Sequence, residues 1–252
     1  MRIATCLLFA VVFVALAAFI APGKKTRIIS IGDSTMAEAS PADNYPGRGW
    51  MQLARPYYSN DVEIYNFARS GRSSKSFRSE GHWDKALQKI EAGDFVFIQF
   101  GHNDQKPDTA RHTDANSSFK ANLIRYTKET KARGAFPILF TSIVRRSFGS
   151  DGKLKDTHGD YVTVVRALAD SLHIPLVDMT QLTGQLVEKM GVEDSKKLYL
   201  YVQPGVTPKL PEGKQDDTHL CVYGAEQYAR LAAKSIKSLR LPLSSYVINT
   251  DQ

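Results

Sequence analysis

The chain contains very little cysteine: Cys6 and Cys221 are the only two among its 252 residues. Cys6 lies inside an apolar N-terminal run, and it comes too early, with no small-residue box before it, for a lipoprotein attachment site. A chain cleaved after that run would carry one thiol and no internal disulfide. The folded part must then be stabilised by its core alone, and about 230 residues are enough to build one.

Low-complexity tracts, internal repeats and Pro/Gly/Ser linkers are also missing, as is any run of more than two consecutive Lys or Arg residues. These absences argue against disorder, against a division into several domains and against a nucleic-acid-binding segment. The formal net charge is nevertheless +7. Basic charge scattered in this way is typical of a solvated surface, and the functional alternative is an anionic binding partner such as an acidic polymer.

Residues 1–21 are predicted to be an export segment. A basic start at Arg2 is followed by an apolar or small run over residues 3–21. This pattern, with small residues near its end, is typical of a cleaved signal peptide. The run is also long enough for an uncleaved membrane anchor, and the basic residues after it indicate no orientation. Either alternative places the folded part outside the cytoplasm, in the periplasm, in the medium or at the cell surface.

Short β-rich runs alternate with longer helical patterns in the rest of the chain, which predicts a parallel sheet with crossover helices. Residues 95–100 are nearly all apolar, as expected of a strand that is covered on both faces. The expected strands cover residues 27–31, 63–67, 95–100, 138–142 and 175–178, and the expected helices residues 49–58, 83–92, 117–133, 161–172, 179–190 and 223–238. The sequence thus predicts one α/β domain over residues 26–245, with loop-rich stretches at 146–158 and 203–217.

The first expected strand ends at Gly32-Asp33-Ser34. In open parallel sheets, functional residues gather beyond the carboxyl ends of the strands. Gly32 would let the backbone turn sharply and expose the Ser34 hydroxyl there. A serine hydroxyl becomes a good nucleophile only when a base removes its proton. Taken alone, Ser34 is a candidate nucleophile or a helix-capping serine.

A base for Ser34 is offered by the segment Asp216-Asp217-Thr218-His219. A catalytic histidine needs one ring nitrogen facing the serine and the other held by an acceptor that fixes its tautomer. Asp216 can fold back on His219 over a single turn, whereas the closer Asp217 is expected to face elsewhere. The alternatives for this segment are a metal-ligand pair and a plain polar surface.

Two loops could supply hydrogen-bond donors to an oxyanion, which acyl transfer also requires. Gly71 follows the second expected strand and could present a backbone N–H. Asn103 follows the third, in the run Gly101-His102-Asn103-Asp104, and offers a side-chain amide. Considered singly, each could be an ordinary turn residue.

These four blocks in this order resemble the SGNH (GDSL) hydrolase superfamily. The resemblance implies a three-layer α/β/α, flavodoxin-like fold with a central parallel sheet. It also implies a triad of Ser34, Asp216 and His219, and an oxyanion hole formed by the N–H groups of Ser34 and Gly71 and the amide of Asn103. Such an enzyme needs no metal or organic cofactor.

A narrower resemblance, to the rhamnogalacturonan acetylesterases, covers nearly the whole chain after the export segment. It is carried by the motifs Gly32-Asp-Ser-Thr-Met36, Gly71-Arg-Ser73, Glu80-Gly81-His-Trp83, Gly93-Asp94, Phe100-Gly-His-Asn-Asp104 and Asp217-Thr-His219. It implies removal of acetyl groups from an acidic pectic polysaccharide. Arg72 and Lys75, beside the oxyanion loop, are then candidates for contacting a uronate carboxylate, although both could be ordinary exposed charges.

Two alternative functions remain at the level of the sequence. One is a related esterase that acts on acetylated xylan, a lipid ester or a thioester, because one fold hosts many substrates. The other is a polysaccharide-binding or surface-anchored protein without activity, which the intact set Ser34, Asn103, Asp216 and His219 argues against.

Overall fold

The computed structural model describes residues 25–39 and 44–251. The predicted export segment and Cys6 therefore lie outside the described residues. Within the described ranges, no helix is long and apolar enough to cross a membrane.

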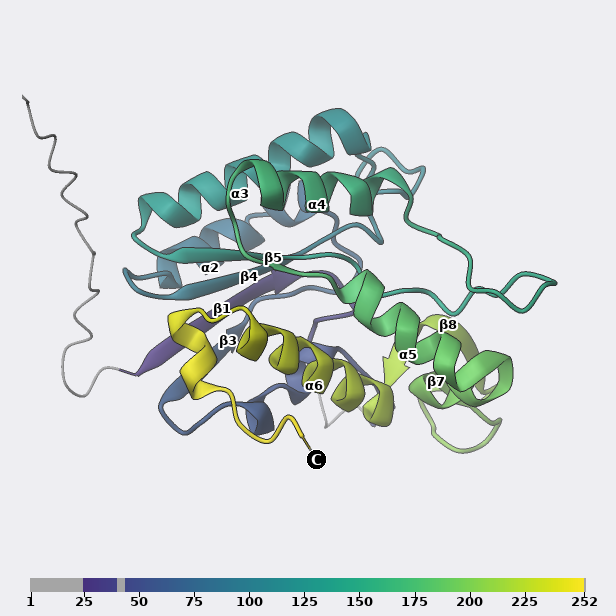
Figure 1. Cartoon of the computed structure of the whole chain (residues 1–252). Helices are drawn as coiled ribbons and strands as arrows, with labels where there is room; N and C mark the ends of the chain where they lie inside the picture. The colour runs from purple at the N-terminus through teal and green to yellow at the C-terminus, as the bar shows by residue number, and fades with distance from the viewer. Residues whose placement is uncertain (1–24, 40–43, 252) are drawn as a thin grey trace, which may run out of the picture.

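A five-stranded parallel sheet with helices on both faces forms the centre of the molecule (Figure 1). Its strand order is β3-β1-β4-β5-β6. These strands are β1 (Thr26–Gly32), β3 (Val62–Asn66), β4 (Phe95–Gln99), β5 (Phe136–Phe140) and β6 (Leu176–Val177). The order of the five parallel strands is that of the flavodoxin-like fold, which confirms the predicted fold class. Its topological switch point lies between β1 and β4.

The helices form two layers, one on each face of the sheet. In Figure 1, α3 and α4 lie over one face, whereas α5 and α6 lie over the other. The α-helices are α1 (Ser74–Ser79), α2 (His82–Lys89), α3 (Lys120–Ala132), α4 (Asp160–Ser171), α5 (Met179–Asp194) and α6 (Val222–Ser238). The central strands β4 and β5 are mostly apolar and buried on both sides because each face packs on helices.

Alternate residues of the central strands enter two separate hydrophobic clusters. In β4, Phe95 and Phe97 pack with Tyr228 of α6 in one cluster, while Val96 and Ile98 belong to the other. Successive side chains of a strand point to opposite faces, so one short apolar run supplies both cores. This arrangement fixes the sheet rigidly and with it the loops at the strand ends.

A second, three-stranded antiparallel sheet lies beside the first, with the order β2-β8-β7. It consists of β2 (Gly47–Arg48), β7 (Tyr199–Val202) and β8 (Lys214–Cys221). Figure 1 shows β7 and β8 at the end of α5, away from the helices on the opposite face. This sheet was not predicted, because part of β8 falls in the stretch that was expected to be a loop.

The expected parallel strands are confirmed to within a few residues, but two helical segments differ from the prediction. The helix expected at 49–58 is wrong: the chain forms two short 3₁₀ helices there, Trp50–Leu53 and Arg55–Tyr57. Pro56 lacks the N–H that a continuous helix needs. The helix expected at 117–133 begins with a π-helical turn, Ala115–Phe119.

Candidate active site

Ser34 lies in a tight turn directly after β1, and Asp33 fixes that turn. The Asp33 carboxylate is fully buried, and its Oδ1 accepts hydrogen bonds from the Thr35 N–H at 2.9 Å and the Thr35 hydroxyl at 2.8 Å. Burial opposes ionisation of Asp33, but His102 and these hydrogen bonds outweigh it and lower the pKa of the carboxyl. Asp33 therefore anchors the turn as a carboxylate.

Close packing leaves room only for a glycine at position 32. A Cβ at this position would lie 2.7 Å from the Gln99 carbonyl oxygen and 2.6 Å from the sulfur of Met36. Any larger residue would separate β1 from β4 or push the nucleophile turn outward. The sequence predicted a glycine for a sharp turn, whereas the structure explains it by close packing.

His219, on β8, lies against Ser34. Its Nε2 is 3.0 Å from Ser34 Oγ, and its Nδ1 is 2.8 Å from Asp216 Oδ2. The other oxygen of Asp216 accepts the backbone N–H groups of Thr218 and His219, each at 2.9 Å. Burial raises the pKa of Asp216, but the hydrogen bonds from His219 dominate and hold it well below its usual value. This is the order of contacts that a serine, a base and an orienting carboxylate require.

Asp217 faces away from His219. Its Oδ1 accepts a hydrogen bond from Arg146 at 2.8 Å and one from the Tyr201 hydroxyl at 2.6 Å. The pairing of β8 with β7 is irregular here, and Asp216 folds back on the backbone N–H groups of Thr218 and His219. This local turn, and not regular strand alternation, brings Asp216 against the imidazole. For the alternative of a metal site, the described part of the chain brings together no group of three His, Cys, Asp or Glu side chains that could hold an ion.

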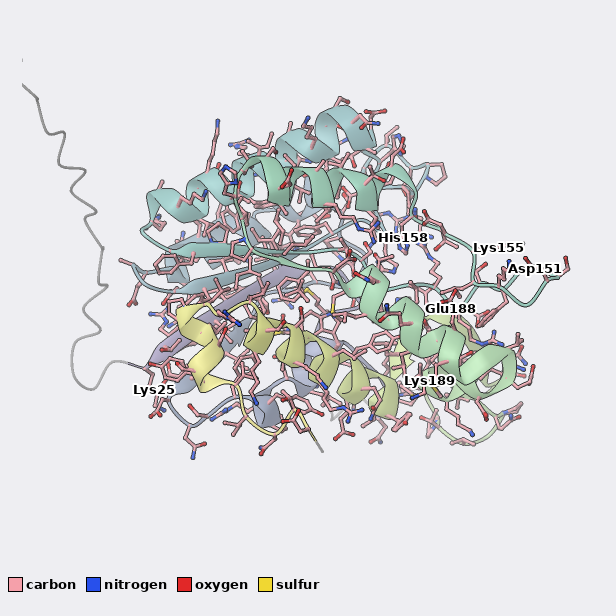
Figure 2. The ribbon with its side chains drawn as sticks, viewed as in Figure 1. Lys25, Asp151, Lys155, His158, Glu188 and Lys189 are labelled. Carbon is pink, nitrogen blue, oxygen red and sulfur yellow. The ribbon has the colours of Figure 1, made fainter. Side chains whose placement is uncertain are left out.

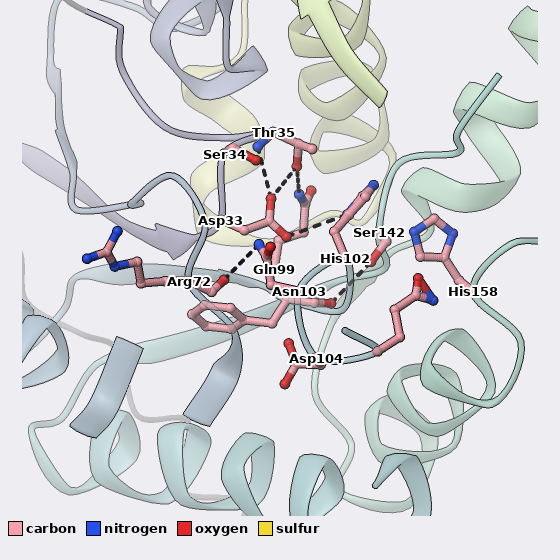
Figure 3. A network of polar contacts seen from close by, with 12 residues as sticks. Asp33, Ser34, Thr35, Arg72, Gln99, His102, Asn103, Asp104, Ser142 and His158 are labelled. Carbon is pink, nitrogen blue, oxygen red and sulfur yellow. Dashed lines mark hydrogen bonds and ion pairs between the residues drawn. The ribbon is translucent and has the colours of Figure 1, made fainter. Parts of the chain in front are cut away.

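The two expected oxyanion donors lie at the same cleft as Ser34 and His219. Gly71 has φ +79°, a left-handed conformation that favours glycine. The Asn103 side chain is 6% exposed, and its amide donates to the Arg72 carbonyl at 3.2 Å (Figure 3). Asn103 is thus held against the loop that carries Gly71. The structure brings Ser34, Gly71, Asn103 and His219 together, while their catalytic roles stay predictions.

The cleft has a volume of about 420 Å³ and a basic lining. Among the described residues that line it, Arg48, Lys106 and Arg111 are basic, and Glu38 is the one acid. Arg111 is 2.7 Å from the carboxylate of Asp108, which offsets part of its charge. Tyr45 adds an aromatic wall to the cleft.

The two basic residues that the sequence suggested for substrate contact are engaged elsewhere. Arg72 pairs with Glu80 at 2.8 Å, and in Figure 3 its side chain points away from Asn103. Lys75 donates to the Thr109 carbonyl at 2.6 Å. Neither residue lines the cleft. The substrate-contact role of Arg72 and Lys75 stays a prediction, and the contacts with Glu80 and Thr109 do not favour it.

A buried histidine pair behind the nucleophile was not anticipated. His102 Nδ1 lies 3.5 Å from Asp33 Oδ2, and the rings of His102 and His158 meet edge to face at 4.5 Å. Burial lowers the pKa of both histidines. Figure 2 shows His158 at the base of the loop whose tip carries Asp151. His158 lies just before α4 and is 3% exposed.

Residues 30–208 match the model of the GDSL-like lipase/acylhydrolase family. The chain belongs to this family. It is 36% identical over 228 residues to the rhamnogalacturonan acetylesterase RhgT of Bacillus subtilis, covering 90% of this chain and 97% of that protein. It is 32% identical to the probable rhamnogalacturonan acetylesterase YesY of the same organism, covering 88% and 97%.

Among solved structures, the YxiM protein of Bacillus subtilis superposes with a TM-score of 0.74 at 26% identity, covering 87% of this chain and 58% of that one. Family membership and these similarities make the chain a carboxylic ester hydrolase. The matched residues include Ser34 but end at 208, before Asp216 and His219.

Proposed function

We propose that this protein is a serine esterase that removes acetyl groups from rhamnogalacturonan, a pectic polysaccharide, through an acetyl-enzyme on Ser34. The observation that carries the chemistry is the continuous contact from Ser34 Oγ to His219 Nε2 at 3.0 Å and from His219 Nδ1 to Asp216 at 2.8 Å. The similarity to enzymes named rhamnogalacturonan acetylesterases over nine-tenths of the chain supports the substrate.

In the first half of the reaction, His219 takes the proton of Ser34 while Oγ forms a bond to the acetyl carbonyl carbon. The carbonyl oxygen becomes an oxyanion, which the N–H groups of Ser34 and Gly71 and the amide of Asn103 are placed to stabilise. The bond to the sugar oxygen then breaks, and that oxygen takes the proton from His219. Asp216 holds the imidazole so that Nε2 faces Ser34 throughout.

In the second half, a water molecule gives its proton to His219 and attacks the acetyl carbon of the acetyl-enzyme. The new tetrahedral intermediate uses the same donors. It collapses to acetate as the Ser34 oxygen recovers the proton, which restores the enzyme.

The lining of the cleft supports an anionic polymer. Arg48, Lys106 and Arg111 border the space above Ser34, and basic side chains favour a carboxylate-bearing substrate electrostatically. We assign uronate recognition to Lys106 and Arg111 in place of Arg72 and Lys75. The net charge of +7 is consistent with this assignment. A protein with this substrate would be exported, which fits the predicted N-terminal segment.

The decisive experiment measures acetate release from acetylated rhamnogalacturonan, acetylated xylan and an aryl acetate, with the wild type and Ser34→Ala. We expect Ser34-dependent release that is strongest on the pectic polymer. Ser34-dependent activity confined to xylan or the aryl ester would keep the chemistry and reject the substrate. Equal activity of Ser34→Ala and wild type would reject the chemistry as well.

Substrate recognition has its own test in Lys106→Met and Arg111→Gln, with Arg72→Gln as the matched control outside the cleft. Loss of one charge contact should lower kcat/KM on the acidic polymer about 10–150-fold, since a hydrogen bond to a charged group contributes about 1.5–3 kcal/mol. Hydrolysis of the uncharged aryl acetate should not change. Equal losses on both substrates, or a loss in Arg72→Gln alone, would contradict the assignment.

A further inference from the structure

Asp104 is a buried carboxylate that the proposed reaction does not use. Its side chain is 0% exposed, and it directly follows Asn103 in the loop after β4. Burial raises the pKa of Asp104 to about 6, although its hydrogen bonds act in the opposite direction. A buried carboxylate that does not contact the substrate needs another explanation.

The contacts of Asp104 reach the other oxyanion loop. The backbone N–H of Ser74 is shared between both carboxylate oxygens, at 3.1 Å from Oδ1 and 3.0 Å from Oδ2. The Ser74 hydroxyl donates to Oδ1 at 2.5 Å, and the Thr113 hydroxyl donates to the same oxygen at 2.9 Å. Ser74 begins α1, three residues after Gly71. The Asp104 side chain, next to Asn103 in the sequence, thus binds Ser74 at the end of the loop that carries Gly71.

We propose that Asp104 is a positioning residue that holds the Gly71 N–H and the Asn103 amide in register as one oxyanion hole, and that it does so as a carboxylate. A second link, from the Asn103 amide to the Arg72 carbonyl, crosses the same two loops. This inference rests on the proposed Ser34 chemistry, and it adds a residue that acts through the donors without touching the substrate.

The carboxylate form matters because of the shared Ser74 N–H. Both oxygens of Asp104 accept that one donor. If either oxygen is replaced by a group that carries hydrogen, a donor meets the Ser74 N–H at about 3 Å and pushes the start of α1 away. An asparagine and a protonated aspartic acid share this defect, since each has only one oxygen without hydrogen.

Within the part of the chain that the structure describes, no ion pair joins Asp104 to a basic side chain. The titratable groups that act on it or are acted on by it are Asp33 after β1, Tyr126 on α3 and Tyr161 on α4. Asp33 favours the protonated form of Asp104, whereas both tyrosine hydroxyls stay uncharged because their pKa is raised. The hydrogen bonds from Ser74 and Thr113 stabilise the ionised form of Asp104. Protonation of Asp104 at lower pH should therefore weaken its contact with Ser74.

The test compares kcat and KM of wild type and Asp104→Asn for an aryl acetate between pH 5 and pH 8. Complete loss of one oxyanion donor costs on the order of 10²–10³ in turnover, so we expect displacement of the donors to lower kcat about 10–100-fold at pH 8. KM should change less than about 2-fold, because the oxyanion forms only in the transition state. The ratio of wild-type to variant kcat should fall towards one at pH 5, where the wild-type carboxyl is itself protonated.

Asp114→Asn is the matched control, because Asp114 also accepts the N–H and the hydroxyl of one serine, Ser117, but on an exposed turn. It should behave like the wild type. A ratio near one at pH 8 for Asp104→Asn would overturn the proposal. A large ratio that does not vary with pH would overturn it too, since a general packing defect has no reason to follow protonation.

Thr113→Val provides a second measurement if Asp104→Asn does not fold. It removes one donor to the carboxylate at nearly constant volume, which favours protonation, so activity should be lost at a higher pH than in the wild type. An unchanged pH profile would contradict the proposal. Ser34→Ala is measured in parallel. If its activity equals that of the wild type, the proposed function fails, whereas a failure of this inference alone appears only in the Asp104 and Thr113 variants.

Discussion

Replacing Asp216 by asparagine should disable the base while leaving its surroundings intact. The Oδ1 position of Asp216 receives two backbone N–H groups, those of Thr218 and His219. The side-chain oxygen of an asparagine must occupy that position, because an NH₂ group there would face two donors. The NH₂ group is then left at the Oδ2 position, 2.8 Å from Nδ1 of His219.

An NH₂ group in that position donates to Nδ1 and forces the imidazole hydrogen onto Nε2. His219 Nε2 would then present a hydrogen to Ser34 and could not accept the serine proton. The same substitution in the trypsin-type triad lowers kcat about 10⁴-fold. We expect a loss of this size here, about 5.4 kcal/mol of transition-state stabilisation at 1.36 kcal/mol per decade.

The assay is steady-state hydrolysis of an aryl acetate at pH 8, with thermal unfolding to verify the fold. Asp217→Asn is the matched control, because Asp217 is the neighbouring carboxylate and binds Arg146 and Tyr201 instead of the imidazole. Its kcat should stay within a few-fold of the wild type. If Asp216→Asn kept kcat within about 10-fold, or if Asp217→Asn lost more activity, the tautomer argument would be refuted.

Three other outcomes follow from the same contacts. Asn103→Ala should lower kcat on the order of 10²–10³-fold at nearly constant KM, measured with the aryl acetate. Gly224→Ala should destabilise the fold by about 1–3 kcal/mol in urea unfolding, because the new Cβ would lie 1.8 Å from the Leu198 carbonyl oxygen. The control, Gly184→Ala in α5, should stabilise the fold by about 0.5–1 kcal/mol, since the nearest atom to its new Cβ is 3.6 Å away. The folded-state pKa of Asp216 is lowered, so its carboxylate stabilises the fold above the unfolded pKa of about 4, and this stabilisation is lost as the pH falls further. The difference in melting temperature between wild type and Asp216→Asn should therefore shrink below about pH 4.

The parallel sheet could be predicted because its central strands β1, β4 and β5 are short runs that are buried on both faces. Residues 95–100 are an example, since Phe97 and Ile98 enter different cores and Gln99 is the one polar residue of the run. The antiparallel sheet could not be predicted in this way. In β8, the residues from Lys214 to His219 are polar and partly exposed, so the strand is formed by pairing with β7 and not by burial of its own side chains.

The site residues near strand ends were accessible to sequence reasoning, because β1, β3 and β4 are neighbours and bring their carboxyl ends together. The basic residues of the cleft were not. Lys106 and Arg111 lie in a segment without periodicity, and their position depends on how the loop after β4 folds over the cleft. No local pattern distinguishes them from Arg72, which pairs with Glu80 instead.

The geometry between Ser34 and His219 depends on two sheets that share no strand. Ser34 follows β1 of the parallel sheet, whereas His219 lies on β8 of the antiparallel sheet. A buried chain of hydrogen bonds joins the two: Trp50, just after β2, donates to Gln99 at 3.0 Å, and Gln99 donates to Thr35 at 2.7 Å (Figure 3).

Thr35 in turn donates to Asp33, which flanks the nucleophile. A displacement of about 1 Å between reacting groups can cost about 10²-fold in rate. This chain, whose members are at most 1% exposed, therefore transmits the position of β2 to the nucleophile turn and keeps the 3.0 Å contact between serine and histidine. β2 also carries Arg48, which lines the cleft, and it pairs with β8, which carries His219. Arg48 and the catalytic base therefore lie on one antiparallel sheet, and Trp50 connects this sheet to the parallel sheet.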